Sequence, residues 1–263
     1  RQFGPVGWRS QAQLLQPRRV GRRAERIEQP REAIATLTRA LTLDRSLVDL
    51  EVPLGEMHRA AGKRALAESD YAEAAIELEK ARLYQRDDAS LCVEHASALR
   101  ALGRNAEAAA AARRGTELAP DRAQIFYLLG ELSAAIDEHA AARAAFERVI
   151  RDQPERFEAQ LGLGLACMKL GKMAEAIEPL TRAVRLDPEH SVALAQLGLA
   201  QQSEQRFADA RDTFLRLAKV RPLDADPLRR LAACRLALGE DEGELDALTT
   251  LARLVPDELD VLE

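Results

Sequence analysis

The segment at residues 162–167, GLGLAC, is the part of this chain that most resembles a site for chemistry, because closely spaced glycines can cradle the phosphates of a dinucleotide. A dinucleotide-binding loop also has a third glycine, follows a β-strand and opens a helix. This segment lacks the third glycine, lies within a predicted helix and follows no predicted strand. We therefore interpret it as helix, and we predict no cofactor.

Histidines and cysteines do not form a metal-binding pattern in this sequence. The histidines are separated by 37, 44 and 51 residues, whereas metal-ligand motifs place two ligands a few residues apart. The three cysteines are odd in number, far apart and at apolar helical positions, which indicates buried free thiols and favours a reducing compartment. We predict no metal site and no catalytic residue, and the chain is not expected to be an enzyme.

A repeat of 34 residues places the glycine-containing segment, the histidines and the cysteines on predicted helices and turns. A leucine–glycine pair recurs at this spacing, with its glycines at Gly130, Gly164 and Gly198. Five prolines from Pro120 to Pro256 follow one another at the same spacing, and so do five alanines from Ala74 to Ala210. A fixed period of 34 residues is typical of stacked helix–turn–helix repeats. The sequence therefore predicts an all-α chain built from pairs of helices.

The clearest repeat covers residues 157–190 and reads FEAQLGLGLACMKLGKMAEAIEPLTRAVRLDPEH. Its leucine–glycine pair is followed by Ala176, Leu180, Ala183 and Pro188, which is the order found in the tetratricopeptide repeat. The chain closely resembles this family from Leu14 to Glu258. The resemblance implies a right-handed α-solenoid of antiparallel helix pairs, and a role in binding other proteins.

Each feature of the repeat has a physical reason. Glycine within a helix costs about 1 kcal/mol relative to alanine, so Gly164 is expected to allow close approach of the paired helix. Gly171 is expected just past the end of the first helix, where a left-handed backbone is common. Pro188 follows the second helix and prevents its continuation.

Counting in steps of 34 gives seven repeats. The first, at residues 14–47, is degenerate because prolines interrupt it, and residues 1–13 before it are expected to be irregular. Residues 48–54 are an insertion, in which Pro53 indicates a bend or an extended helix start. The other six are residues 55–88, 89–122, 123–156, 157–190, 191–224 and 225–258. Residues 259–263 begin a further helix, so the natural protein is expected to continue beyond Glu263.

The charge of the chain is uneven along its length. The formal net charge is −5, yet residues 1–45 hold ten arginines and four acidic residues, and residues 240–263 hold nine acidic residues and one arginine. Solvated chain ends are one interpretation, and weak end-to-end self-association is the other. Basic residues are not interleaved with aromatic residues, so we predict no nucleic-acid binding. No apolar run is long enough to insert into a membrane, and we expect a cytoplasmic location, with the periplasm left open.

The resemblance implies that the first helix of each repeat lines a concave groove for a partner. Residues at i, i+4 and i+7 share one face of a helix, and the groove positions of the family fall on such a face here. We call them the inner-face residues, and they are Arg59, Lys63, Arg100, Tyr127, Leu161, Leu165, Met168, Leu199, Gln202 and Arg229.

Two interpretations of the apolar inner-face residues remain open: they are core that packs on the next repeat, or they are an exposed surface for a partner's helical or extended segment. Met168 beside Leu165 favours an adaptable binding surface. Arg59, Lys63 and Arg100 make the early end basic and predict a partner with an acidic flank. Family members that hold the tails of heat-shock chaperones use groove asparagines with lysines. This chain has a single asparagine, in a predicted loop, so it does not resemble those members.

Together these features predict a bacterial protein–protein interaction scaffold or adaptor that organises a multiprotein assembly. One alternative is the recruiting or regulatory arm of a larger enzyme. Another is a cell-envelope assembly factor for pilus or polysaccharide export.

Overall fold

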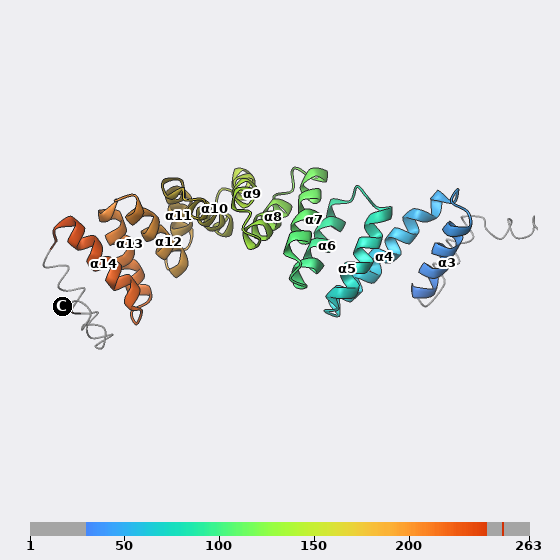
Figure 1. Ribbon diagram of the computed structural model, residues 1–263, viewed down its shortest axis with the longest axis horizontal. Coiled ribbons are helices and arrows are strands. Elements are labelled where there is room, and N and C mark those ends of the chain that lie inside the picture. The colour runs from blue at the N-terminus through green and yellow to red at the C-terminus, as the bar shows by residue number, and fades with distance from the viewer. Residues whose placement is uncertain (1–29, 241–248, 250–263) are drawn as a thin grey trace, which may run out of the picture. The chain divides into compact units, whose positions relative to one another are not determined.

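The computed structural model describes residues 30–240 and residue 249, and this part of the chain is helical, with no β-strand (Figure 1). A turn of 3-10 helix, η1 (Val48–Leu50), precedes α4. The α-helices are α3 (Pro30–Leu43), α4 (Glu51–Ala67), α5 (Tyr71–Tyr84), α6 (Ala89–Ala101), α7 (Asn105–Leu118), α8 (Ala123–Ala135), α9 (His139–Asp152), α10 (Phe157–Lys169), α11 (Met173–Leu186), α12 (Ser191–Ser203), α13 (Phe207–Val220) and α14 (Ala225–Leu238). The all-α fold predicted from the sequence is confirmed.

The helices repeat with the period of the sequence. The first helices α6, α8, α10, α12 and α14 begin 34 residues apart, and so do the second helices from α5 to α13. First and second helices of a repeat pack on each other, and a second helix packs on the following first helix, as α10, α11 and α12 show. The chain divides between Ile125 and Phe126 into two compact units, which we call the N-terminal half and the C-terminal half and describe separately.

The turn between the two helices of a repeat has a left-handed residue at a fixed position. Gly171 has a φ of 74°, as the sequence predicted for a residue that ends the first helix. Residues at the same repeat position also have positive φ, and they are Ser69, Gly103, Asp137, Gln205 and Gly239. The turn geometry is therefore kept even where the sequence has no glycine.

Residues 48–54, predicted as an insertion with a bend or an extended helix start, form η1 and the extended start of α4. Helix α4 begins at Glu51, four residues before the predicted start of its repeat at Gly55. Pro53 lies in the first turn of α4, where a proline is tolerated because the first backbone N–H groups of a helix have no partner within it. The predictions for residues 1–13 and 259–263 lie outside the described residues.

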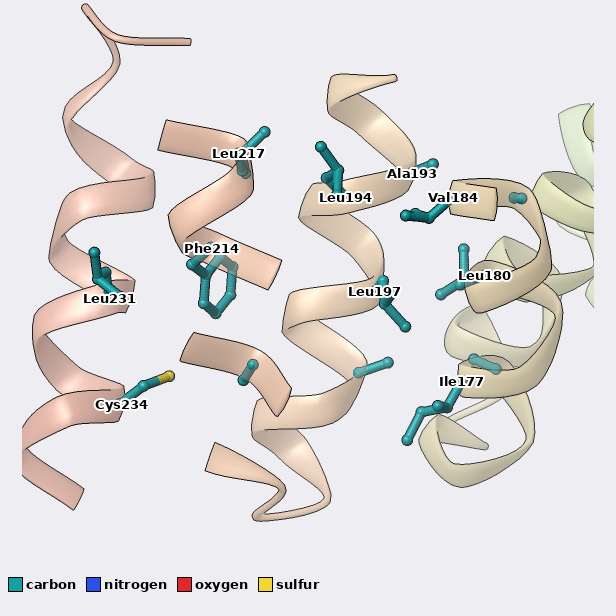
Figure 2. Packing of buried hydrophobic residues seen from close by; sticks show 14 of the residues in the cluster. Ile177, Leu180, Val184, Ala193, Leu194, Leu197, Phe214, Leu217, Leu231 and Cys234 are labelled. Carbon is teal, nitrogen blue, oxygen red and sulfur yellow. The ribbon is translucent and has the colours of Figure 1, made fainter. Parts of the chain in front are cut away.

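The core of the C-terminal half is a cluster of buried side chains that extends from α10 to α14 (Figure 2). Leu180 of α11, Leu194 of α12 and Phe214 of α13 are fully buried. Each pair of neighbouring helices shares part of this cluster, so the core is a series of local interfaces. This arrangement is expected for repeat proteins, in which stability is close to a sum of local terms.

Gly164 illustrates why the leucine–glycine pair recurs. A Cβ atom added to Gly164 would lie 2.5 Å from Cγ of Leu180, on the paired helix α11. At Gly198, an added Cβ would lie 2.6 Å from the ring of Phe214 on α13. The predicted close approach of the paired helix at Gly164 is confirmed, and it explains a glycine within the helix.

We expect Gly164→Ala to lower the free energy of unfolding by about 1–2 kcal/mol, because overpacking of a buried interface outweighs the gain in helix propensity. Gly115→Ala is the matched control, since its added Cβ would lie 3.1 Å from Cγ2 of Ile125, a milder contact. Gly115→Ala should change stability by less than about 0.5 kcal/mol. Denaturant unfolding measures both, and equal effects of the two substitutions would contradict this account of the repeat glycine.

Candidate partner-binding site

The inner face of the N-terminal half carries a network of charged side chains. Arg59 of α4 donates to both oxygens of Glu94 of α6, over 2.8 and 2.7 Å. A third Arg59 nitrogen donates to Asp88 Oδ2 over 2.6 Å, and Lys63 Nζ lies 3.2 Å from Glu94 Oε1. Bidentate pairs of this kind fix geometry as well as adding energy. The network joins α4 to α6 and to the residue that precedes α6.

Asp88 and Glu94 balance the charges of Arg59 and Lys63, which lie at the basic early end of the inner face. Partial burial acts to raise the pKa of Asp88, but a backbone hydrogen bond from Leu91 and the charge of Arg59 outweigh burial and hold that pKa below its ordinary value. Arg100 is exposed on α6. Arg59 and Lys63 therefore do not support a partner with an acidic flank.

Tyr127 begins the inner face of the C-terminal half on α8. Its hydroxyl donates to Glu131 Oε1 over 2.9 Å, and the guanidinium of Arg156 lies 3.9 Å from the centre of its ring. The ring also meets Phe146 of α9 edge-on. Burial, followed by the hydrogen bond to Glu131, raises the pKa of Tyr127 to about 12. Tyr127 is thus held in one orientation and stays un-ionised at neutral pH.

Apolar inner-face residues follow on α10 and α12. Leu161 and Met168 of α10 and Leu199 of α12 are half-buried and pack against the core cluster of this half. Leu165 is half-buried as well, and so is Gln202, whereas Arg229 of α14 is exposed. Leu161, Met168 and Leu199 therefore contact the core and also keep part of their surface accessible, so both interpretations of the sequence apply to them.

A protein-family model of the tetratricopeptide repeat (TPR) matches residues 93–148, 134–191 and 195–258. These matches cover more than half of the chain and include α10 and α11, whose spacing first suggested the family. The chain belongs to the tetratricopeptide repeat family. Helices α6, α8, α10, α12 and α14 lie wholly or partly within these matches, as the first helices of TPR repeats.

Several solved structures share this TPR fold. YrrB, described as a TPR protein with an unusual peptide-binding site, is 23% identical with a TM-score of 0.61, and the match covers 69% of this chain and 94% of YrrB. A MamA structure is 20% identical with a TM-score of 0.60, covering 65% of this chain and 94% of MamA. MamA from Desulfovibrio magneticus RS-1 is 23% identical with a TM-score of 0.58, covering 64% and 95%. At these identities the likeness concerns the fold.

Curated proteins gave no match to this chain. Within residues 30–240, no helix combines the length and apolar character that crossing a membrane requires.

Sequence reasoning missed a buried polar pair between α4 and α5. His58 of α4 and Glu77 of α5 are both buried, and His58 Nδ1 lies 2.7 Å from Glu77 Oε2. The other Glu77 oxygen accepts from Lys80 over 2.6 Å. The signal was present in the repeat itself, because the positions equivalent to Glu77 carry Ala111, Ala145, Pro179 and Thr213.

Glu77→Gln should lower the melting temperature at pH 7, and this difference from the wild type should narrow below about pH 4.5. Burial acts to raise the pKa of Glu77, but hydrogen bonds from Lys80 and His58 outweigh it and hold the pKa below its ordinary 4.5. A carboxyl group with a lowered folded-state pKa stabilises the fold above its unfolded-state pKa, and this contribution is lost as the pH falls through the folded-state pKa. Thermal unfolding across this pH range measures the effect. Glu117→Gln, at an exposed ion pair on α7, is the control. A difference in melting temperature between Glu77→Gln and the wild type that stays constant with pH would contradict the prediction.

Three hollows recur at one position of the TPR repeat, and sequence reasoning missed them too. Each lies between two consecutive second helices, with the first helix between them as its floor. They are the hollow at α3, α4 and α5, of about 270 Å³, the hollow at α5, α6 and α7, of about 600 Å³, and the hollow at α9, α10 and α11, of about 230 Å³. Their floors include Ala61, His95 and Leu163, which are equivalent residues of three repeats. None of these three hollows is lined by an inner-face residue.

Proposed function

We propose that the chain is a non-catalytic protein–protein interaction scaffold, which binds a segment of a partner protein on its inner face and organises a multiprotein assembly. Membership of the TPR family supports an interaction scaffold in general terms. Binding of a partner segment on the inner face is supported by the row of half-buried apolar side chains on α10 and α12, namely Leu161, Leu165, Met168 and Leu199. Partly accessible apolar surface on two successive first helices allows a partner segment to bury its own apolar side chains.

The partner segment is helical or extended, and its main contact is apolar. The peptide-binding site of YrrB, which shares the fold, supports a peptide segment as the ligand here. Met168 contributes a flexible and polarizable side chain, which adapts to different partner shapes. An acidic flank is no longer part of the proposal, because Asp88 and Glu94 already neutralise Arg59 and Lys63.

The cytoplasm is the proposed location. The observation that supports it is that Cys92, Cys167 and Cys234 are free and buried, as in a reducing compartment. End-to-end self-association stays a prediction, because most of the charged residues on which it depends lie outside the described residues.

Cross-linking from the inner face tests this proposed function. A photoreactive amino acid replaces Leu165, and in a second protein it replaces Arg185, which is exposed on the second helix α11 of the same repeat. After irradiation in the source cells, we expect a defined partner joined to position 165 and identified by mass spectrometry. Capture from position 185 alone, or no adduct at position 165, would contradict binding at the inner face.

A further inference from the structure

The hollow between α5 and α7 is larger than its equivalent in the C-terminal half for a specific reason. In the smaller hollow, Arg143 of α9 donates to Glu147 over 2.7 Å and lies 2.8 Å from Glu175 of α11, so it bridges the two second helices. The residue equivalent to Arg143 in the larger hollow is Ala75. The bridge is therefore absent there, and α5 and α7 leave about 600 Å³ between them instead of about 230 Å³.

Apolar side chains form part of the walls and floor of the larger hollow. Ala75 and Ile76 of α5 face Ala110 and Ala111 of α7 across it, and Leu99 of α6 forms part of the floor. The equivalents of Ala110 and Ala111 in the smaller hollow are the larger residues Glu178 and Pro179. Ala110 and Ala111 of α7 thus leave open the space that the larger side chains occupy in the smaller hollow.

The charged residues around this hollow are already paired with one another. Arg82 donates to Glu79 over 2.8 Å, and Arg104 donates to Glu107 through two nitrogens, over 2.7 and 2.5 Å. Lys80 donates to the buried Glu77. His95, in the floor, has its Nδ1 3.3 Å from Arg82 Nη1. A ligand with a charged anchor would have to break one of these pairs, whereas an uncharged apolar anchor would not.

An apolar stripe beside the hollow extends the same surface along α5. Ile76 lines the hollow and is 52% exposed, and Leu83, two helical turns further along the same face, is 58% exposed. The positions equivalent to Leu83 in the later second helices are charged, and they are Glu117, Arg151, Arg185 and Lys219. Two exposed apolar residues at i and i+7 match the spacing by which an amphipathic partner helix makes contact.

We propose that the hollow between α5 and α7, together with Ile76 and Leu83, is a second docking site that takes the uncharged apolar side chains of an amphipathic helix from a partner protein. The absence of the bridging arginine provides the space. The ion-paired residues around the hollow select against a charged anchor, and Ile76 and Leu83 on α5 provide the contacts for a helix. The site lies on second helices, whereas the inner face lies on first helices. The scaffold therefore has two kinds of binding surface.

The repeat itself supplies the blocking variant. Ala75→Arg places at this position the residue that Arg143 provides in the C-terminal half, and both acceptors of that arginine have equivalents here, Glu79 and Glu107. The variant is therefore expected to fill the hollow and to keep the fold. Ala110→Glu, which copies Glu178, is a second blocking variant. Ala101→Arg is the control, because it adds the same charge at the exposed end of α6, where the equivalent residue is Lys169.

The test is a selection of helix-forming peptides from a displayed library against the wild-type chain, followed by affinity measurements on the variants. We expect the selection to yield peptides with uncharged apolar residues at i, i+3 or i+4, and i+7. These peptides should bind Ala75→Arg and Ala110→Glu at least about 30-fold more weakly, and should bind Ala101→Arg and Leu165→Glu as they bind the wild type. Circular dichroism and thermal melting check that each variant is folded.

Three results would overturn the second docking site. The selection could yield no such peptide, the peptides could bind the two blocking variants as tightly as the wild type, or their anchors could be charged. Sedimentation of the wild type and Ala75→Arg distinguishes another occupant. If the wild type self-associates and Ala75→Arg does not, the hollow binds a second copy of this chain, and the proposal of a partner helix is wrong.

Discussion

Phe214→Ala should lower the free energy of unfolding by about 3–5 kcal/mol, which is the usual cost of removing a buried aromatic side chain. Phe214 is fully buried in the core cluster shared by α12, α13 and α14 (Figure 2). Its ring also fits closely against the backbone of Gly198, where an added Cβ would lie 2.6 Å away. An alanine at position 214 cannot keep this contact, so the loss combines a cavity with a weakened helix interface.

The effect should be local as well as large. Because neighbouring repeats contribute separate stability terms, hydrogen exchange should accelerate in α12 and α13 and change little in α4 to α7. Leu223→Ala is the matched control, since Leu223 is 86% exposed and its truncation should cost less than about 0.5 kcal/mol. Uniform acceleration of exchange throughout the described helices would contradict the view of the core as a series of local interfaces.

The helix pairs could be predicted from the sequence because the repeat is a local signal. Gly164 is a glycine that its helix would otherwise disfavour, and its spacing from Ala176 and Pro188 places the paired helix and its end within one 34-residue segment. The sequence left a bend and an extended helix start open before Gly55, because no other repeat has extra residues before its first helix. A proline in the first turn fits a helix as well as a bend, so Pro53 did not decide between them.

The candidate site was less predictable because it depends on partners from different helices. Arg59 and Lys63 are basic residues on one face of α4, but their charges are balanced by Asp88 and Glu94, which lie 29 and 35 residues from Arg59 in the sequence. The large hollow was difficult to predict for a similar reason. It depends on the absence of an arginine at Ala75, which becomes informative only when compared with Arg143 and its two acceptors.

The second large effect concerns binding. Leu165→Glu should weaken the complex with the partner by at least about 30-fold, because it places a carboxylate against apolar partner surface. Leu165 is half-buried, and glutamate has a helix propensity close to that of leucine. The variant is therefore expected to fold with unchanged helix content and a melting temperature close to that of the wild type. Leu223→Glu introduces the same change at an exposed site and should bind normally.

The most direct test is a titration of the partner captured from position 165 into the wild type, Leu165→Glu and Leu223→Glu, with the melting temperature of each protein recorded beside it. An inner face that binds the partner predicts that Leu165→Glu loses affinity by at least about 30-fold while all three proteins melt at nearly the same temperature. Unchanged affinity of Leu165→Glu would contradict binding at the inner face. A large fall in its melting temperature would show instead that Leu165 belongs to the core, and the inner face would then not be a binding surface.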